Sequence, residues 1–262
     1  MKPEHPSDPQ RQHLRRPGGV VAYTDVGRGP PLVALHGCPG SVRDWRWLGA
    51  ALEPHLRLVR LDLPGFGETP LEVFPDPSFE GRARWVLDVM AALDVHRFAV
   101  MGHSAGGPLA LEVAAVSPDR VTALVLLASP GLRPHQPFRR HLVARKLSPL
   151  LRAPLLGGAL THLLRAGFQR AGFPPGLPDH ALQQSMHIIN HLRFARQRAN
   201  AARVRVPTLV AWTEDDHFIE SDIGRELAEA IPHARGLSFS AGGHHLQKTR
   251  ATEIGRAVEG LL

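Results

Sequence analysis

The sequence is poor in cysteine, in long apolar runs and, over one long segment, in acidic residues. Cys38 is the single cysteine among 262 residues, so no internal disulfide can form, and no Cys/His spacing resembles a structural zinc site. Residues 1–19 contain no apolar run, which argues against a secretory signal. The most apolar stretch, 121–128, is far too short to cross a bilayer. We therefore expect a cytoplasmic protein without stable membrane insertion.

Acidic residues are scarce in residues 133–206, which contain 13 basic residues and one acidic residue, Asp179. The rest of the chain has 18 basic and 23 acidic residues, so the formal net charge of +7 comes from this one segment. A basic balance can indicate nucleic-acid or membrane contact. No nucleic-acid-binding motif accompanies it, and we expect no nucleic-acid partner.

The arginines of this segment allow two interpretations. Residues such as Arg193, Arg196 and Arg198 could recognise an anionic part of a substrate, because guanidinium groups bind carboxylates well. Alternatively, they lie on the solvated faces of helices. We favour the second interpretation, because helices place most long side chains outward.

Apolar runs of strand composition alternate with segments of helical periodicity along most of the chain. Many of these runs are too continuous for a sheet with one solvated face, so they indicate a mostly parallel sheet covered by helices on both faces. The predicted strands are 20–26, 32–35, 58–61, 98–101, 121–127, 208–212 and 236–239, and the predicted helices are 45–56, 79–93, 106–116, 221–231 and 252–262.

About 80 residues between the runs ending at 127 and starting at 208 fit no strand–helix unit. They contain helical stretches near 138–151, 155–171 and 179–202, broken by proline and glycine. We interpret this segment as a helical lid inserted into the sheet domain. The predicted organisation is a flexible N-terminal tail (1–17), a core formed by 18–132 and 206–262, and a lid (133–205).

The sequence Gly-His-Ser-Ala-Gly-Gly at 102–107 stands between a predicted strand and a predicted helix. A serine at a sharp strand-to-helix turn needs glycines around it, because larger side chains would collide there. Such a turn exposes the hydroxyl of Ser104. The pattern alone could be a tight turn without catalytic function, but the strand before it and the helix after it favour a nucleophile.

A serine hydroxyl is a poor nucleophile until a base takes its proton, and that base needs an acid to orient it. Residues 212–217 follow a predicted strand and offer Asp215 and Asp216. Residues 242–245 follow the last predicted strand and offer His244 and His245. These positions at strand ends predict a Ser–Asp–His set in that chain order.

The chain resembles the α/β-hydrolase fold superfamily, as a lid-containing, esterase-like member with a serine nucleophile. In the family's acid motif a glycine stands three residues before the acid. Thr213 occupies that place here, which maps the acid onto Asp216, and the final Gly-His of the family maps onto His244. The matching segments are the His-Gly-x-Pro-Gly oxyanion loop at 36–41, the Asp-x-Pro-Gly-x-Gly loop at 62–67, the nucleophile elbow at 102–107 and the strand leading to the acid at 207–212.

The resemblance implies an eight-stranded, mostly parallel sheet with helices on both faces and a catalytic triad. Ser104 would attack a carbonyl carbon, His244 would act as general base and then general acid, and Asp216 would orient the imidazole. The backbone N–H groups of Cys38 and Ala105 would form the oxyanion hole. Neither a metal nor an organic cofactor is implied.

A serine at the elbow differs from the aspartate that haloalkane dehalogenases and epoxide hydrolases use there. We therefore expect hydrolysis of a carboxylic ester or related acyl bond of a small molecule through an acyl-serine intermediate, and the basic segment would allow that molecule to be anionic. The alternatives are a C–C bond hydrolase, which typically has a longer oxyanion loop than 36–41, an acyltransferase, and a non-enzymatic small-molecule receptor. Asp62 and Gly65 are interpreted as loop-forming residues. No oligomeric state follows from these patterns.

Overall fold

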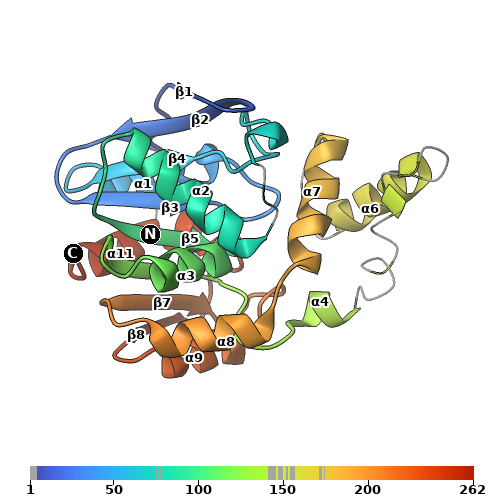
Figure 1. Cartoon of the computed structure of the whole chain (residues 1–262). Coiled ribbons are helices and arrows are strands. Elements are labelled where there is room, and N and C mark those ends of the chain that lie inside the picture. The colour runs from blue at the N-terminus through green and yellow to red at the C-terminus, as the bar shows by residue number, and fades with distance from the viewer. Residues whose placement is uncertain are drawn as a thin grey trace.

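The computed structural model describes residues 5–74, 76, 78–140, 146, 150, 151, 153, 157–170, 173 and 175–262. Its eight-stranded sheet has the order β1-β2-β4-β3-β5-β6-β7-β8, with antiparallel pairing at β1–β2 and β2–β4 and parallel pairing elsewhere (Figure 1). This confirms the predicted fold class. The strands are β1 (Gln12–Arg16), β2 (Gly19–Val26), β3 (Pro31–Leu35), β4 (Arg57–Leu61), β5 (Phe98–His103), β6 (Val121–Leu127), β7 (Thr208–Thr213) and β8 (Arg235–Phe239).

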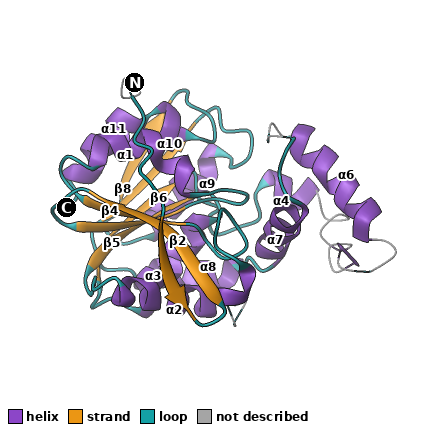
Figure 2. Ribbon diagram, turned by 90° about the horizontal axis from the view of Figure 1, so that it is seen from above, coloured by secondary structure: helices purple, strands orange, loops and turns teal. Residues whose placement is uncertain are grey.

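Helices cover both faces of the sheet (Figure 2). Successive side chains of a strand point to opposite faces, and in β5 both sets are apolar. Phe98 and Val100 pack with α2 (Phe79–Ala92) and α3 (Gly106–Val116), while Ala99 and Met101 pack with α1 (Arg46–Leu52) and α11 (Ala251–Glu259). The remaining core helices are the 3-10 helices η1 (Val42–Trp45) and η2 (Leu71–Val73), α9 (Ser221–Ala230) and α10 (Leu246–Thr249).

The N-terminal region differs from the predicted tail. Residues 12–16 of the expected flexible segment 1–17 form the edge strand β1, which pairs with β2 in the register Gln12↔Tyr23 to Arg16↔Gly19. Leu14 is the one apolar residue of this strand, so the sequence has no hydrophobic alternation there. The strand depends on backbone pairing with its neighbour.

The segment between β6 and β7 contains α4 (Gln136–Arg140), α6 (Gly157–Arg170), α7 (Asp179–Asn190) and α8 (Phe194–Arg203). Figures 1 and 2 both show α4, α6 and α7 to one side of the sheet and its covering helices. Part of the predicted helix 138–151, namely 141–145 and 147–149, lies outside the described residues, as do 155, 156 and 171 of the predicted helix 155–171.

The predicted helix 179–202 is two helices, α7 and α8. His191 is the C-cap residue of α7, and its imidazole Nδ1 donates to the carbonyl of His187 at 2.7 Å. This side-chain hydrogen bond satisfies a carbonyl group in the last turn of α7. The second helix, α8, packs against α3 in the layer that covers the sheet. None of the helices in the described part of the chain has the length and apolarity that a membrane span requires.

Candidate active site

Ser104 lies at a sharp turn between β5 and α3. Its φ angle is 50°, in the left-handed region that L-residues rarely adopt. The N–H of Gly107 donates to the carbonyl of Ser104 at 2.8 Å and closes the turn. A Cβ atom at Gly102 would overlap the carbonyl oxygen of Gly106, and one at Gly106 would overlap that of Leu35. The close approach of these backbones requires the glycines and holds the serine at the N-terminus of α3.

The side chains of Ser104, His244 and Asp216 form a chain of two hydrogen bonds. His244 Nε2 lies 2.9 Å from Ser104 Oγ, and His244 Nδ1 lies 2.8 Å from Asp216 Oδ2. The other carboxylate oxygen of Asp216 accepts the backbone N–H groups of Phe218 at 2.7 Å and Ile219 at 3.1 Å. A carboxylate can only accept hydrogen bonds, so the Nδ1 proton of His244 points at Asp216 and Nε2 is free to accept from the serine.

The neighbouring acid, Asp215, contacts the backbone of the histidine loop. Its two carboxylate oxygens accept the N–H groups of Gly243 at 2.8 Å and Gly242 at 3.1 Å. The same two N–H groups lower the pKa of Asp215, since they stabilise its charged form. The two consecutive carboxylates therefore have different contacts: Asp216 is hydrogen-bonded to the imidazole of His244, and Asp215 to the backbone before it.

The expected oxyanion donors, Cys38 and Ala105, belong to two segments that meet at Ser104. Ala105 follows Ser104 directly and is the N-cap residue of α3, where backbone N–H groups point out of the helix. The loop of Cys38 lies against the serine, because a Cβ atom at Gly37 would be 3.1 Å from Ser104 Cβ. His36 fixes this loop: its Nδ1 donates to the carbonyl of Gly37 at 2.6 Å, and its Nε2 accepts the N–H of Leu63 at 2.9 Å.

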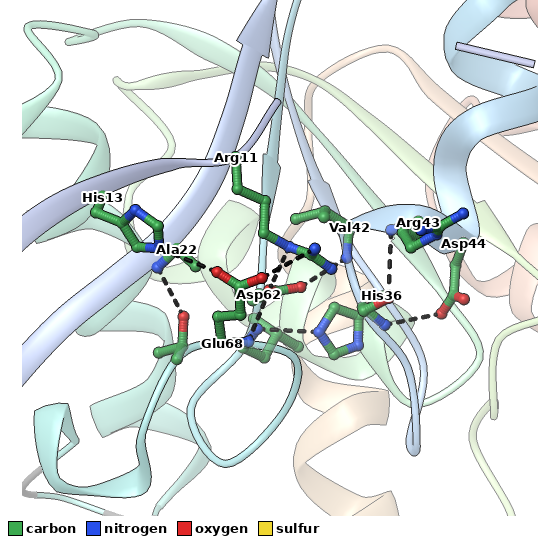
Figure 3. A network of polar contacts seen from close by, with 12 residues as sticks. Arg11, His13, Ala22, His36, Val42, Arg43, Asp44, Asp62 and Glu68 are labelled. Carbon is green, nitrogen blue, oxygen red and sulfur yellow. Dashed lines mark hydrogen bonds and ion pairs between the residues drawn. The ribbon is translucent and has the colours of Figure 1, made fainter. Parts of the chain in front are cut away.

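Asp62 connects several loops beside this site (Figure 3). Its buried carboxylate accepts the backbone N–H groups of Val42 at 2.7 Å and Glu68 at 2.9 Å. Arg11, which precedes β1, donates to the same carboxylate at 3.3 Å and pairs with the Glu68 side chain at 3.1 Å. These contacts agree with the prediction of a loop-forming residue, and they show how the N-terminal segment joins the network.

The thiol of Cys38 lies among protein atoms, although the residue as a whole is partly exposed. Burial raises the pKa of this thiol to about 12, and the nearby Arg82 guanidinium and a contact with Ser185 of α7 offset the effect only in part. A thiol with such a pKa stays protonated at neutral pH and is a weak nucleophile. The raised pKa therefore favours a neutral thiol at Cys38.

His103 is a functional candidate that the sequence analysis did not single out. Its buried ring lies 5.0 Å from the ring of His244, and its Nε2 donates to the backbone carbonyl of His244 at 2.9 Å. Burial, together with the neighbouring histidines, lowers the pKa of His103 well below its ordinary value. The sequence signal for His103 was its position directly before Ser104. Its hydrogen-bond partner, the carbonyl of His244, is 141 residues away in the sequence.

Three phenylalanine rings extend from His244 to helix α6. The ring of Phe218 lies 5.0 Å from the ring of His244, Phe173 lies 5.9 Å from Phe218, and Phe168 of α6 lies 5.3 Å from Phe173. The three rings are only partly buried. An apolar wall of aromatic rings thus borders the histidine on the side of α6.

Several basic residues in the described part of the 133–206 segment make contacts within the protein. Arg196 of α8 pairs with Glu112 of α3 and Glu80 of α2. Arg198 donates to the carbonyl of Leu132 at 3.1 Å, and Arg193 donates to that of Asn190 at 3.1 Å. The favoured interpretation, a solvated helix face, is wrong for Arg196, because its partner is a buried carboxylate on another helix. The same ion pair removes Arg196 as a candidate for binding an anionic substrate.

A cavity of about 590 Å³ lies between α6, α7 and η2. Its lining includes Leu71, Thr161 and Gln183. Gln184 lies between this cavity and the loop after β4, where its Nε2 donates to the carbonyl of Pro64 at 3.4 Å. Among the described residues, those that line the cavity include no member of the Ser–His–Asp set, so the cavity is distinct from the candidate site.

Comparisons with known proteins agree on one family. A family model described as the alpha/beta hydrolase fold matches residues 30–153. A Klebsiella pneumoniae (strain 342) protein, provisionally named a carbamate hydrolase, is 31% identical over 85% of this chain and 88% of its own length. A Comamonas testosteroni protein named 2-hydroxy-6-oxo-6-phenylhexa-2,4-dienoate hydrolase is 26% identical over 90% of this chain and 89% of its own length. The crystal structure of an alpha/beta hydrolase fold protein from Burkholderia ambifaria has a TM-score of 0.75 at 24% identity, covering 97% of this chain and 99% of that one.

An eight-stranded, mostly parallel sheet with a serine at the strand-to-helix turn after β5 is the architecture of an α/β hydrolase. The chain belongs to the α/β-hydrolase fold family, whose members compared above are hydrolases.

Proposed function

We propose that the protein hydrolyses a carboxylic ester or related acyl bond of a small molecule through an acyl-serine intermediate. The observation that carries this proposal is the pair of hydrogen bonds from Ser104 Oγ to His244 Nε2 (2.9 Å) and from His244 Nδ1 to Asp216 Oδ2 (2.8 Å). Their distances lie in the range that general-base activation of a serine requires.

In the first step, Ser104 Oγ attacks the acyl carbon while its proton moves to His244 Nε2. The tetrahedral intermediate then collapses, the bond to the leaving group breaks, and His244 returns the proton to that group. In the second step, a water molecule gives a proton to His244 while its oxygen attacks the acyl-serine ester. The bond between the acyl carbon and Ser104 Oγ then breaks, and His244 returns the proton to Ser104 Oγ, which releases the carboxylic acid and restores the serine. Asp216 stabilises the imidazolium that forms in both steps.

The negative charge that develops on the acyl oxygen requires fixed donors. In this proposal they are the backbone N–H groups of Cys38 and Ala105. Support comes from the loop of Cys38, which lies against the serine, and from the place of Ala105 at the N-terminus of α3, where the helix dipole also favours negative charge.

We further propose that residues 133–205 act as a lid on a core formed by 18–132 and 206–262. Two contacts support this division. Ser185 of α7 contacts the thiol of Cys38, and the Phe168–Phe173–Phe218 row connects α6 with His244. Helices of this segment therefore border both the oxyanion loop and the general base.

The test is the release of nitrophenol from short-chain p-nitrophenyl esters by the wild type and by Ser104→Ala. The proposal predicts a rapid initial burst of nitrophenol in the wild type and none in the variant. Ser117→Ala, at the other end of α3, is the matched control and should retain full activity. Equal rates for wild type and Ser104→Ala would overturn the proposal, and binding of substrates without turnover would favour a small-molecule receptor instead.

A second candidate is hydrolysis of a C–C bond next to a ketone. It is favoured by the 26% identity, over 90% of this chain, to the Comamonas testosteroni dienoate hydrolase. Incubation with a 2-hydroxy-6-oxo-dienoate would bleach the visible absorbance of its conjugated enolate if this candidate is right. Transfer of the acyl group to an alcohol would use the same intermediate as ester hydrolysis, and product analysis with added alcohols separates it from hydrolysis.

A further inference from the structure

We propose that His103 is a positioning residue that holds the backbone of His244 in register with the nucleophile. This inference rests on the proposed function, because it assigns His103 a role in aligning the general base of that reaction. His103 directly precedes Ser104 at the end of β5, so a rigid turn of the sheet connects the two residues.

The contact between the two histidines runs from side chain to backbone. His103 Nε2 donates to the carbonyl oxygen of His244 at 2.9 Å, and Gln247 Nε2 approaches His103 Nδ1 at 3.4 Å. The donor at Nε2 and the acceptor at Nδ1 describe one neutral tautomer of the imidazole. His103 is only 3% exposed, and its ring packs edge-on against Trp45 at 6.4 Å. The ring is therefore fixed in one orientation.

A neutral His103 allows the adjacent His244 to become positively charged. The ring centroids of His103 and His244 are 5.0 Å apart, and a second positive charge at that distance would oppose formation of the His244 imidazolium. Burial lowers the pKa of His103, so the ring donates its hydrogen bond without carrying a charge.

The other residues of the histidine loop are held by side chains from the last residue of β7 and from the end of α10. Thr213 Oγ1 donates to the carbonyl of Gly243 at 3.1 Å, Thr249 Oγ1 to that of Gly242 at 2.7 Å, and Arg250 Nε to that of Ala241 at 2.7 Å. His103 differs from these donors because it belongs to the nucleophile turn. It thus couples the backbone of the base directly to that of the nucleophile.

Two variants separate this role from simple packing. His103→Phe keeps an aromatic ring against Trp45 but removes the donor, whereas His103→Gln places an amide N–H at about the reach of Nε2. We expect His103→Phe to lower kcat by about 10- to 100-fold with little change in KM, because misalignment of catalytic groups costs rates of this order. His103→Gln should recover most of the lost kcat. Thermal unfolding of both variants shows whether they fold.

A second measurement does not depend on turnover. In protein labelled with ¹⁵N-histidine, the Nδ1–H resonance of His244, identified by its loss in His244→Gln, reports the hydrogen bond to Asp216. We expect this resonance to shift or broaden in His103→Phe and to persist in His103→Gln. An unchanged resonance and unchanged kcat in folded His103→Phe would overturn the inference, as would equal losses in the two variants. Failure of the proposed function gives a different result: turnover would then be unaffected by Ser104→Ala, whatever the resonance does.

Discussion

The carboxylate of Glu112 on α3 is fully buried and receives the guanidinium of Arg196 from α8, with Arg196 Nε at 2.9 Å from Glu112 Oε2. Asn200, one turn further along α8, donates to the same carboxylate. This cluster attaches α8, the last helix between β6 and β7, to α3, the helix that follows Ser104. A basic residue of this segment therefore serves the packing of the protein.

Loss of Arg196 should destabilise the fold more than loss of the whole ion pair. Arg196→Met leaves a buried carboxylate without its cation, and because the guanidinium is 37% exposed we expect a loss of about 2–3 kcal/mol in the free energy of unfolding. The double variant Glu112→Leu/Arg196→Met removes the buried charge and should be more stable than the single variant. Urea unfolding measures both, and a double variant less stable than Arg196→Met would contradict this account.

The two consecutive acids should differ in their effect on catalysis. Asp216→Asn disturbs the tautomer and orientation of His244, and we expect it to lower kcat on the order of 10³- to 10⁴-fold. Asp215→Asn keeps one acceptor for the N–H groups of Gly242 and Gly243, so its cost should stay within about tenfold. Steady-state kinetics on a nitrophenyl ester compares them. The reverse order would move the orienting acid to Asp215.

Asp215 should also contribute stability that depends on pH. Its pKa is lowered in the folded protein, mainly by the N–H of Gly243, so its contribution is complete above the unfolded pKa of about 3.9 and is lost as the pH falls through the folded value. The difference in unfolding free energy between the wild type and Asp215→Ala should therefore be largest near neutral pH and shrink in acid. A difference that stays constant or grows toward low pH would contradict the lowered pKa.

Cys38 should resist alkylation in the folded protein. With a pKa of about 12, its thiolate fraction at about pH 8 is about 10⁻⁴, against roughly a quarter for an ordinary cysteine. We expect iodoacetamide to label the native protein at least about 1000-fold more slowly than free cysteine, and the unfolded protein at an ordinary rate. Rapid labelling of one thiol per native chain would show that the thiol is accessible and ionised.

The parts of the fold and site that depend on local patterns could be predicted from the sequence. The strand–glycine–serine–helix pattern predicted the turn at Ser104. The family motif has its acid three residues after the position of Thr213, which pointed to Asp216, and in the structure Asp216 is hydrogen-bonded to His244. Strand β1 could not be predicted, since Leu14 is its one apolar residue.

Contacts between distant segments could not be predicted either. The partner of Arg196 is 84 residues away on another helix, and nothing near Arg196 in the sequence distinguishes it from the other arginines of the segment. Likewise, the hydrogen bond from His103 to the carbonyl of His244 spans 141 residues and involves a backbone atom that every residue has. The first contact depends on the packing of α8 against α3, and the second on the approach of the loop after β8 to the end of β5.

The most direct test of the central claim is to locate the acyl group on the enzyme. The protein is mixed with an excess of a short-chain p-nitrophenyl ester, quenched in acid during the burst, digested and analysed by mass spectrometry. The account predicts one acyl group per chain, on the peptide that contains Ser104, and no adduct in Ser104→Ala. An acyl group on another residue, or turnover by Ser104→Ala at the rate of the wild type, would contradict it.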